Sequence, residues 1–442
     1  MKIILISLGC DKNLVDSEKM LGILESRGYT FTDDEEEADA ALVNTCCFIG
    51  DAKEESIDQI LRLGELRKSG QLKALIISGC LSQRYRDQIH EELPEVDACI
   101  GIASITEVAD AFDEALGGDP RDHYADLKNA PTAGTRRIVT TGGHFAYLKI
   151  AEGCNKNCTY CIIPKVRGGY RSTPMEELEE EARLLAQRGV KELILVAQET
   201  TLYGIDLYGR KSLPELVHRL AQIPGIEWIR ILYGYPEELT DEIIEMMATE
   251  PKVCHYLDLP IQHCSDRILR AMGRRTTQAD LRRMVEKLRS RIPDICLRTT
   301  LISGFPGETQ EEYEELYRFV TELEFDRLGV FAYSQEEDTV AATLPDQVPE
   351  EVKIARRDEL MELQQAICFD KAEEMVGREL TVMVEGRVAG EDTYVTRTYR
   401  DAPEVDGYLF LEASRELLTG DMVRVRVTGA RDYDLIGELI RS

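Results

Sequence analysis

The chain has 442 residues, which is enough for about three domains at roughly 150 residues each. Hydrophobic residues make up 43% of it and charged residues 31%, a composition that excludes a globally disordered chain. Its 82 acidic and 53 basic residues give a net charge of −29, which argues against nucleic-acid binding by the surface as a whole and favours a basic partner, such as a cationic protein.

The N-terminus begins with a short apolar run, Ile3–Ile6 and then Leu8, and Asp11 and Lys12 follow closely. This run is shorter than the roughly 7–15 apolar residues of a secretion signal. No apolar run in the chain approaches the ~20 residues that a membrane span needs. We therefore expect residues 3–9 to form a β-strand and the protein to be cytoplasmic, with no membrane partner.

Residues 2–115 alternate between strand-like and helix-like segments. Strands are expected at 3–9, 41–45, 75–79 and 98–103, and helices at 13–26, 52–69, 83–93 and 105–116. The alternation predicts a parallel α/β sheet with helices on both faces. We assign residues 1–118 to this N-terminal domain and residues 119–137 to a linker, because the chain runs Gly-Gly-Asp-Pro at 117–120 and Asn-Ala-Pro-Thr-Ala-Gly-Thr at 129–135.

Twelve cysteines in a cytoplasmic chain are expected in metal or catalytic roles rather than in disulfides. Three of them end predicted strands of the N-terminal domain, and we name them the strand-end triad: Cys10, Cys46 and Cys80. Neighbouring parallel strands place their carboxyl ends along one edge of the sheet, where open α/β folds bind ligands. We expect these thiolates to converge on one cluster; three unrelated cysteines are the alternative.

The remaining cysteines are simpler to interpret. Cys47 adjoins Cys46 and is expected to point away from it. Four cysteines lie within apolar patterns and are expected to be small buried hydrophobic residues, namely Cys99, Cys254, Cys296 and Cys368. Cys264 follows His263 in a loop after a predicted strand, and a metal or catalytic role for it is the less favoured interpretation.

From Phe145 the alternation resumes, with strands expected at 145–151, 192–198, 228–235, 255–262, 295–304 and 327–334 and helices between them, such as 175–188, 213–223, 241–249, 278–291 and 310–323. Six β/α units predict a partial (βα)6 barrel rather than the closed eight-stranded TIM barrel. A charged amphipathic helix is expected at 350–376. We assign residues 138–375 to this central domain.

The central domain carries a Cys-x3-Cys-x2-Cys run, which we name the loop triad: Cys154, Cys158 and Cys161. Three thiolates within eight residues, with no fourth cysteine or histidine beside them, suit a 4Fe-4S cluster that leaves one iron open for a ligand. Structural zinc is the alternative, but it usually takes four protein ligands. The run follows the first barrel strand, and barrels of this kind place reactive groups at the C-terminal ends of their strands.

Residues 376–442 form the last predicted domain. Five short strand-like stretches, at 380–385, 394–398, 407–411, 422–427 and 434–440, predict a small antiparallel β-barrel of the OB type. Such barrels often bind nucleic acid, but residues 377–442 hold nine arginines, no lysine and thirteen acidic residues. This charge is a poor match to RNA.

The two triads and the order of the domains resemble the methylthiotransferase branch of the radical S-adenosylmethionine (SAM) enzymes, along essentially the whole chain. The resemblance implies an N-terminal methylthiotransferase domain, a central radical SAM domain and a C-terminal TRAM domain. It implies that the loop triad holds a 4Fe-4S cluster that binds SAM, with Tyr160 in the aromatic position of the motif. The strand-end triad would hold a second, auxiliary 4Fe-4S cluster.

The resemblance also implies a mechanism. The cluster on the loop triad would cleave SAM reductively, and the deoxyadenosyl radical would remove hydrogen from an unactivated carbon, a step that no acid or base can perform. A second SAM would methylate sulfur at the auxiliary cluster before the methylthio group is delivered. The protein would then be a sulfur-transferring enzyme that needs a reduced electron donor, flavodoxin- or ferredoxin-like, and a sulfur donor.

Candidate SAM contacts follow from their places on the barrel strands. Gln198 and Glu199 end the second strand and are expected to bind the ribose or the methionine amino group, ordinary loop polarity being the alternative. Gly304 ends a strand that resembles the adenine-side strand of the family, although a plain turn would also explain it. Arg167 and Arg171 follow the loop triad and are expected to face either substrate carboxylates or solvent.

Two members of this branch are candidates for the activity of this chain. One modifies isopentenyl-adenosine in tRNA, and its relatives tend to carry a Gln-Met-Asn run after the first cluster cysteine. The other modifies an aspartate of small-subunit ribosomal protein twelve, and four stretches resemble it: 7–18, 197–204, 235–240 and 259–264. We therefore expect methylthiolation of the β-carbon of that aspartate, in the free protein or in the ribosomal subunit, because an acidic enzyme suits a basic substrate.

Three alternatives stay open at this point. The first is methylthiolation of tRNA, and the second is a non-catalytic iron–sulfur carrier or electron-transfer protein. The third is an interaction protein stabilised by zinc. The sequence does not identify the sulfur source, the electron donor or the oligomeric state.

Overall fold

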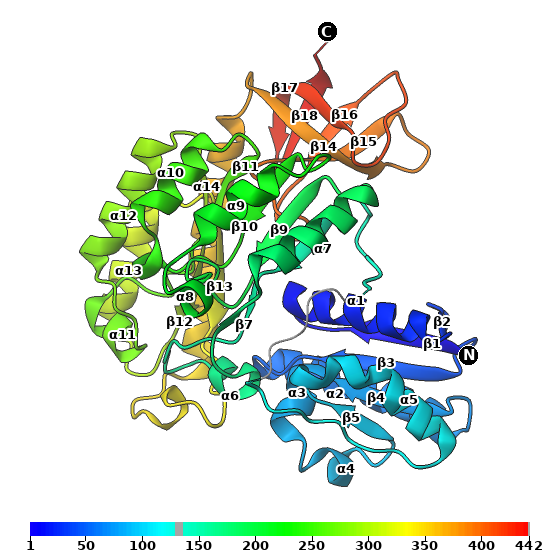
Figure 1. Cartoon of the computed structure of the whole chain (residues 1–442). Coiled ribbons are helices and arrows are strands. Elements are labelled where there is room, and N and C mark those ends of the chain that lie inside the picture. Colours follow the sequence, from blue (N-terminus) through cyan, green and yellow to red (C-terminus); the bar gives the residue numbers. More distant parts are fainter. Residues whose placement is uncertain (129–135, 441–442) are drawn as a thin grey trace.

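The computed structural model describes residues 1–128 and 136–440, so residues 129–135 of the predicted linker lie outside the described residues. Figure 1 shows three parts in chain order: an N-terminal α/β part in blue and cyan, a central part in green and yellow, and a C-terminal barrel in orange and red. None of the described helices has the length and apolar character needed to cross a membrane.

The N-terminal part is a five-stranded parallel sheet in the order β2-β1-β3-β4-β5. Its strands are β1 (Lys2–Ser7), β2 (Thr30–Phe31), β3 (Ala40–Thr45), β4 (Ala74–Ser78) and β5 (Ala98–Ile100). Every residue of β3 and β4 is buried, as a parallel sheet covered by helices requires. The predicted fold is confirmed, with β1, β3 and β4 as neighbours; the short β2 was not expected.

The N-terminal helices are α1 (Asp11–Ser26), α2 (Gly50–Lys68), α3 (Gly79–Tyr85), α4 (Ile89–Glu92) and α5 (Val108–Gly117), with a 3-10 turn at Ile102–Glu107. The single helix expected at 83–93 is wrong, because the chain forms α3 and α4 with a break at 86–88. Gly79, with a φ of +92°, turns the chain directly from β4 into α3. Cys80 therefore lies in the first turn of α3, and α4 is a separate element.

The central part has six parallel strands in the order β13-β12-β11-β10-β9-β6. They are β6 (Phe145–Lys149), β9 (Glu192–Val196), β10 (Trp228–Ile231), β11 (Val253–Asp258), β12 (Cys296–Ser303) and β13 (Arg327–Ala332). The barrel is open, because β6 and β13 are its edges. An unexpected ribbon of β7 (Ala151–Glu152) and β8 (Arg171–Ser172) follows β6.

Helices connect the strands and cover one face of this sheet. They are α6 (Ile163–Arg167), α7 (Met175–Gln187), α8 (Ile205–Tyr208), α9 (Leu213–Ala221), α10 (Asp241–Thr249), α11 (Asp266–Ala271), α12 (Gln278–Arg291) and α13 (Gln310–Leu323), with 3-10 turns at Pro236–Glu238 and Ala341–Thr343. The long α14 (Glu350–Glu373) then leads to the C-terminal barrel. The predicted partial (βα)6 barrel is confirmed.

The C-terminal part is a closed five-stranded barrel in the order β14-β15-β16-β18-β17. The strands are β14 (Glu379–Arg387), β15 (Thr393–Thr398), β16 (Leu409–Glu412), β17 (Met422–Arg431) and β18 (Asp434–Leu439). The predicted small barrel is confirmed with one refinement: β16 and β18 pair in parallel. An odd number of strands cannot close with antiparallel neighbours throughout, so one parallel pair is required.

A buried ion network attaches the C-terminal barrel to the central sheet. Glu192 of β9 accepts hydrogen bonds from Arg230 of β10 at 2.7 Å and from Arg397 of β15 at 2.6 Å. All three side chains are fully buried. Removing one partner would leave an uncompensated buried charge, which typically costs about 3–5 kcal/mol. The C-terminal barrel is therefore held firmly against the face of the central sheet that the helices leave free.

Candidate functional site

The loop triad lies between β7 and α6, which are labelled in Figure 1. In the chain, this loop comes after the C-terminal end of β6. The β7–β8 ribbon closes this loop at its base. Within it, the Cys154 amide donates to Gly168 O at 3.1 Å, and the Cys161 amide donates to Cys158 O at 3.1 Å. Backbone contacts thus hold the three cysteines in one closed loop.

A glycine precedes three of the six triad cysteines, and each of these glycines has a positive φ: Gly9 (+88°), Gly79 (+92°) and Gly153 (+75°). A Cβ at Gly153 would lie 2.2 Å from Gly169 O, and one at Gly79 would lie 2.4 Å from Thr45 O. A side chain has no space at either position, and the conformation itself favours glycine. The Gly-Cys pair was visible in the sequence, although its meaning depends on these close approaches.

The structure places the strand-end triad at the common edge formed by the ends of β1, β3 and β4. A Cβ on Gly9 would lie 2.9 Å from Cys46 Sγ, so β1 and β3 meet closely at their ends. Asn13, which is fully buried, donates to Leu8 O at 2.9 Å and to Thr45 O at 3.0 Å, and its Oδ1 lies 4.0 Å from Cys80 Sγ. One amide therefore ties together three strand ends, a role that the sequence did not reveal.

Neither triad is gathered tightly enough to hold a single ion. Over the described ranges, one trio of His, Cys, Asp or Glu has all its ligand atoms within 4.8 Å of one another, and it is His90, Cys99 and Asp122. Tetrahedral zinc brings its ligand atoms to about 3.3–3.8 Å of one another. Thiolates that bind a 4Fe-4S cluster are spread over separate irons. Three thiols at wider spacing therefore fit a cluster better than a zinc ion.

Burial raises the pKa of cysteines in both triads. It raises the pKa of Cys154 to about 11, and that of Cys161 to about 12. Burial also raises the pKa of Cys80 to about 12, although the nearby Arg167 opposes this shift. At neutral pH these three groups are therefore thiols, and a metal that bound them would have to displace the proton.

Arg167 lies beside the strand-end triad, and the expectation that it faces substrate carboxylates or solvent is wrong. Its side chain is 1% exposed, donates to Glu152 Oε2 at 2.9 Å and hydrogen-bonds Asn13 Oδ1. Burial would lower its pKa, but Cys80 and Glu152 outweigh burial and hold the pKa well above its ordinary value. The cation of Arg167 favours the thiolate state of Cys46 and Cys80, and so opposes the effect of burial on their pKa values.

Two of the predicted SAM contacts, Glu199 and Gln198, each have a side-chain oxygen that accepts no hydrogen bond from the described residues. Glu199 is fully buried, and its Oε2 has no hydrogen-bond partner within the described part of the chain. Burial raises its pKa to about 7, although Lys156 Nζ lies 3.8 Å from Oε1. Gln198 donates to Glu152 Oε1 at 2.9 Å, and its own Oε1 likewise lacks a partner there. Both side chains could accept hydrogen bonds from a polar cofactor.

The other two predicted contacts are Tyr160 and Gly304. Tyr160 is half-buried and packs against a small apolar cluster that contains Met272, Phe305 and Tyr333. Gly304 has a φ of +69°, and a Cβ there would lie 2.3 Å from Lys353 Cγ of α14. The absence of a side chain at Gly304 therefore lets α14 approach, and its contact with SAM stays a prediction.

Two residues beside the loop triad were not anticipated. Tyr235 Oη lies 2.6 Å from Cys158 Sγ. The guanidinium of Arg274 lies 3.8 Å from the centre of the Tyr235 ring, and its Nε has no partner in the described residues. Tyr235 belongs to the stretch 235–240 that the sequence comparison singled out, but its contact with the cysteine depends on the tertiary fold.

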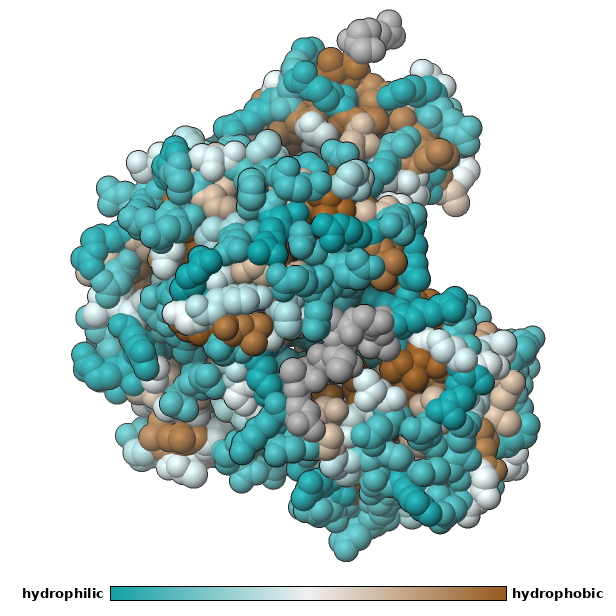
Figure 2. All heavy atoms as spheres, in the orientation of Figure 1, coloured by the Kyte–Doolittle hydropathy of each residue, from teal (hydrophilic) through white to brown (hydrophobic). Residues whose placement is uncertain are grey.

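A cavity of about 450 Å³ opens where the three parts of the molecule meet. Cys10 and Asp11 line it from the N-terminal part, Tyr233 and Arg298 from the central part, and Glu404 from the C-terminal barrel. Figure 2 shows the surface hollowed between the N-terminal part and the C-terminal barrel. The arrangement leaves room beside Cys10 for a polypeptide segment.

Three family models match successive parts of the chain. The Radical SAM superfamily model matches residues 148–320, and the TRAM domain model matches residues 376–440. The model of an uncharacterised protein family, UPF0004, matches residues 2–101. Together the models cover the regions that hold both triads and the C-terminal barrel.

Full-length relatives share the whole arrangement. The ribosomal protein uS12 methylthiotransferase RimO of Lachnoclostridium phytofermentans is 58% identical over 437 residues, which is 99% of either chain. The protein of the same name from Symbiobacterium thermophilum is 48% identical and covers 99% of this chain and 90% of its own. Among solved structures, the radical SAM methyltransferase TsrM from Kitasatospora setae aligns with a TM-score of 0.54 at 14% identity, over 74% of this chain and 72% of its own, which shows a shared fold.

Proposed function

The chain belongs to the ribosomal protein uS12 methylthiotransferase family within the radical SAM superfamily, and we propose that its two cysteine triads are the two cluster sites of that enzyme. The observation that carries the assignment is identity of 45–58% over nearly the full length to relatives that share this one name. The substrate uS12 is the small-subunit ribosomal protein twelve expected from the sequence. The tRNA-modifying alternative is not favoured.

We assign a 4Fe-4S cluster to each triad, because each offers three buried or half-buried thiols at a spacing too wide for one ion. When bound, the cluster on the loop triad supplies the electron that cleaves SAM, and the cluster on the strand-end triad supplies the sulfur. In the protein, the cation of Arg167 would offset negative charge at the strand-end triad, and Asn13 joins the ends of β1 and β3 through hydrogen bonds to Leu8 O and Thr45 O.

Glu199 and Gln198 are the groups we assign to SAM. Each carries an oxygen without a partner in the described chain, beside the loop triad, and an unsatisfied buried acceptor costs about 1–3 kcal/mol unless a ligand pairs with it. Glu199 is suited to the methionine amino group, because a carboxylate with a pKa of about 7 can be ionised beside a cation. Tyr160 would cover the cofactor from its apolar side.

The cavity beside Cys10 is the place we assign to the substrate segment. All three parts of the molecule line it, so a loop of uS12 could reach the strand-end triad while it contacts the acidic C-terminal barrel. The reacting atom would be the β-carbon of an aspartate in that loop. A flavodoxin- or ferredoxin-like protein would deliver the electron, and a separate donor would replace the sulfur.

The decisive experiment is a paired anaerobic assay with the reconstituted enzyme, SAM and a chemical reductant. Free uS12, small ribosomal subunits and tRNA are offered in parallel, and each is then analysed by mass spectrometry. We expect a methylthio mass gain on an aspartate of uS12 and none on tRNA. A mass gain on tRNA alone would contradict the assignment of uS12 as the substrate. Comparing free uS12 with small subunits identifies which form of uS12 is modified.

A further inference from the structure

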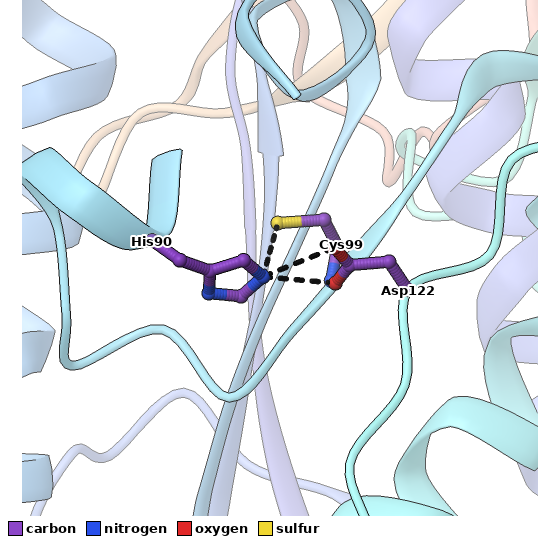
Figure 3. Close-up of side chains that lie close together, drawn as sticks. All are labelled: His90, Cys99 and Asp122. Carbon is purple, nitrogen blue, oxygen red and sulfur yellow. Dashed lines mark hydrogen bonds and ion pairs between the residues drawn. The ribbon is translucent and has the colours of Figure 1, made fainter. Parts of the chain in front are cut away.

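The His90, Cys99 and Asp122 side chains meet at the outer edge of the N-terminal sheet (Figure 3). His90 lies on α4, Cys99 on the edge strand β5, and Asp122 on the segment that follows α5. His90 Nε2 lies 3.0 and 3.1 Å from the two carboxylate oxygens of Asp122, and 3.9 Å from Cys99 Sγ. None of the three belongs to either triad.

The geometry differs from that of an activated nucleophile. In a Cys-His-Asp relay the carboxylate holds one ring nitrogen while the other nitrogen faces the nucleophile. Here the thiol and the carboxylate both approach the same nitrogen, Nε2 of His90, as Figure 3 shows. A sulfur, a nitrogen and an oxygen therefore converge on one point, which is the arrangement of a coordination site.

We propose that His90, Cys99 and Asp122 bind a divalent transition ion of the zinc type, with water as its fourth ligand. Bond lengths of zinc imply separations of about 3.3–3.6 Å between such ligand atoms. Here the separations from His90 Nε2 to Asp122 Oδ1 and to Cys99 Sγ are 3.0 and 3.9 Å, and all three ligand atoms lie within 4.8 Å of one another. A set of one thiolate, one imidazole and one carboxylate excludes calcium and magnesium, which prefer oxygen throughout. A dication also balances the charges of the thiolate and the carboxylate.

The surroundings already orient two of the ligands. The Cys99 amide donates to Asp122 Oδ1 at 2.9 Å, which fixes the carboxylate against β5. The Cys99 side chain is fully buried, whereas the His90 side chain is 43% exposed, so an ion could enter from solvent on the His90 side. Backbone hydrogen bonds of His123 to Cys99 and Gly101, both 2.8 Å, hold the segment beside the strand.

The ion would act as a clamp at the sheet edge. It would join α4, which has four residues, and the segment after α5 to β5. This is the region in which the chain leaves the N-terminal part for the central one. A short helix and an irregular segment contribute little packing of their own, so a coordinating ion would order both at once.

Zinc content tests the site in the holoenzyme. The anaerobically purified enzyme, loaded with both clusters, is dialysed against buffered micromolar free zinc, and its zinc and iron are measured together. We expect about one zinc in addition to about eight irons per chain. His90→Gln, an exposed position, should lower bound zinc about tenfold or more without loss of iron, and Cys99→Ser should do the same.

The matched control is His255→Gln. His255 is also partly exposed and also pairs with a carboxylate, Asp294, at 2.7 Å, but no cysteine of residues 1–128 or 136–440 completes a trio with that pair. This variant should keep the zinc of the wild type. Equal zinc in the wild type and in His90→Gln would overturn the proposal.

X-ray absorption at the zinc edge separates the site from vacated cluster sites. The proposed ligands predict one sulfur at about 2.3 Å and three nitrogen or oxygen neighbours at about 2.0–2.1 Å. Three sulfurs would place the zinc in a triad and contradict the proposal, whatever the zinc content.

Discussion

Each of the two cysteine triads presents three thiols, but the two triads are built in different ways. The loop triad occupies eight consecutive residues, and its own backbone and one short ribbon hold it. The strand-end triad is assembled from three strands, with cysteines at positions 10, 46 and 80. The comparison shows that three thiols can be brought together either within one loop of the chain or by the alignment of neighbouring strands in a sheet.

The difference lies in what each triad depends on. The strand-end triad needs the amide of Asn13 to join the ends of β1, β3 and β4, and it lies beside the cation of Arg167, which comes from the central part. The loop triad needs mainly its glycine turn and its closing ribbon. Damage to the N-terminal sheet should therefore impair sulfur transfer while it spares SAM cleavage.

The largest effect is expected from Cys158→Ala, which removes the middle thiol of the loop triad. Both SAM cleavage and the methylthiolated product should disappear, because the cluster that cleaves SAM would lose a ligand. Deoxyadenosine and product are measured together by chromatography and mass spectrometry. Deoxyadenosine formed at the wild-type rate would refute the assignment of this cluster.

Cys46→Ala removes a thiol of the strand-end triad and should affect only one of the two activities. We expect iron to fall from about eight to about four per chain, with product lost and deoxyadenosine formation largely kept. Iron analysis and the same paired assay check this. Full methylthiolation by this variant would refute the auxiliary role of the strand-end triad. Loss of both activities would contradict the prediction that the two triads act in separate steps.

Gly9→Ala tests whether the geometry of the strand ends is required. The φ of +88° disfavours alanine by about 1–2 kcal/mol, and the new Cβ would lie 2.7 Å from Cys46 Cβ. Auxiliary iron and product should fall severalfold while SAM cleavage persists. The control is Gly28→Ala, because Gly28 has a φ of +94° but no atom of the described part of the chain within 4 Å of its missing Cβ. Equal losses of iron in the two variants would show that strain alone, not contact with Cys46, explains the effect.

The smallest effect is a pH dependence at Glu199. Its pKa is raised to about 7, so the carboxylate is mostly ionised at pH 8 and mostly protonated at pH 6. If it pairs with the amino group of SAM, affinity should fall about five- to tenfold as the pH drops across that range. Isothermal titration with SAM measures the affinity at each pH. Glu199→Gln should bind SAM more weakly, and its affinity should not change with pH. If the SAM affinity of this variant depended on pH as strongly as that of the wild type, Glu199 would be excluded as the cause.

Much of the architecture could be predicted from local patterns. The alternation of apolar strands and amphipathic helices predicted both parallel sheets, and the short strands beyond residue 377 predicted the C-terminal barrel, because burial on one or both faces imposes a period on the sequence. The loop triad was equally accessible, since its three ligands lie within one loop. The placement of Cys10, Cys46 and Cys80 at strand ends followed from the topology of a parallel sheet.

Only the tertiary structure decided which side chains meet across these elements. Arg167 was expected to face substrate carboxylates or solvent, but it is buried beside the strand-end triad. Cys99 is a buried core residue as expected, but the sequence did not show that its thiol lies near His90 and Asp122. Periodicity reports whether a position is buried, but not which distant residue lies opposite. That pairing depends on how two parts of the chain pack together, and a single sequence carries no local signal for it.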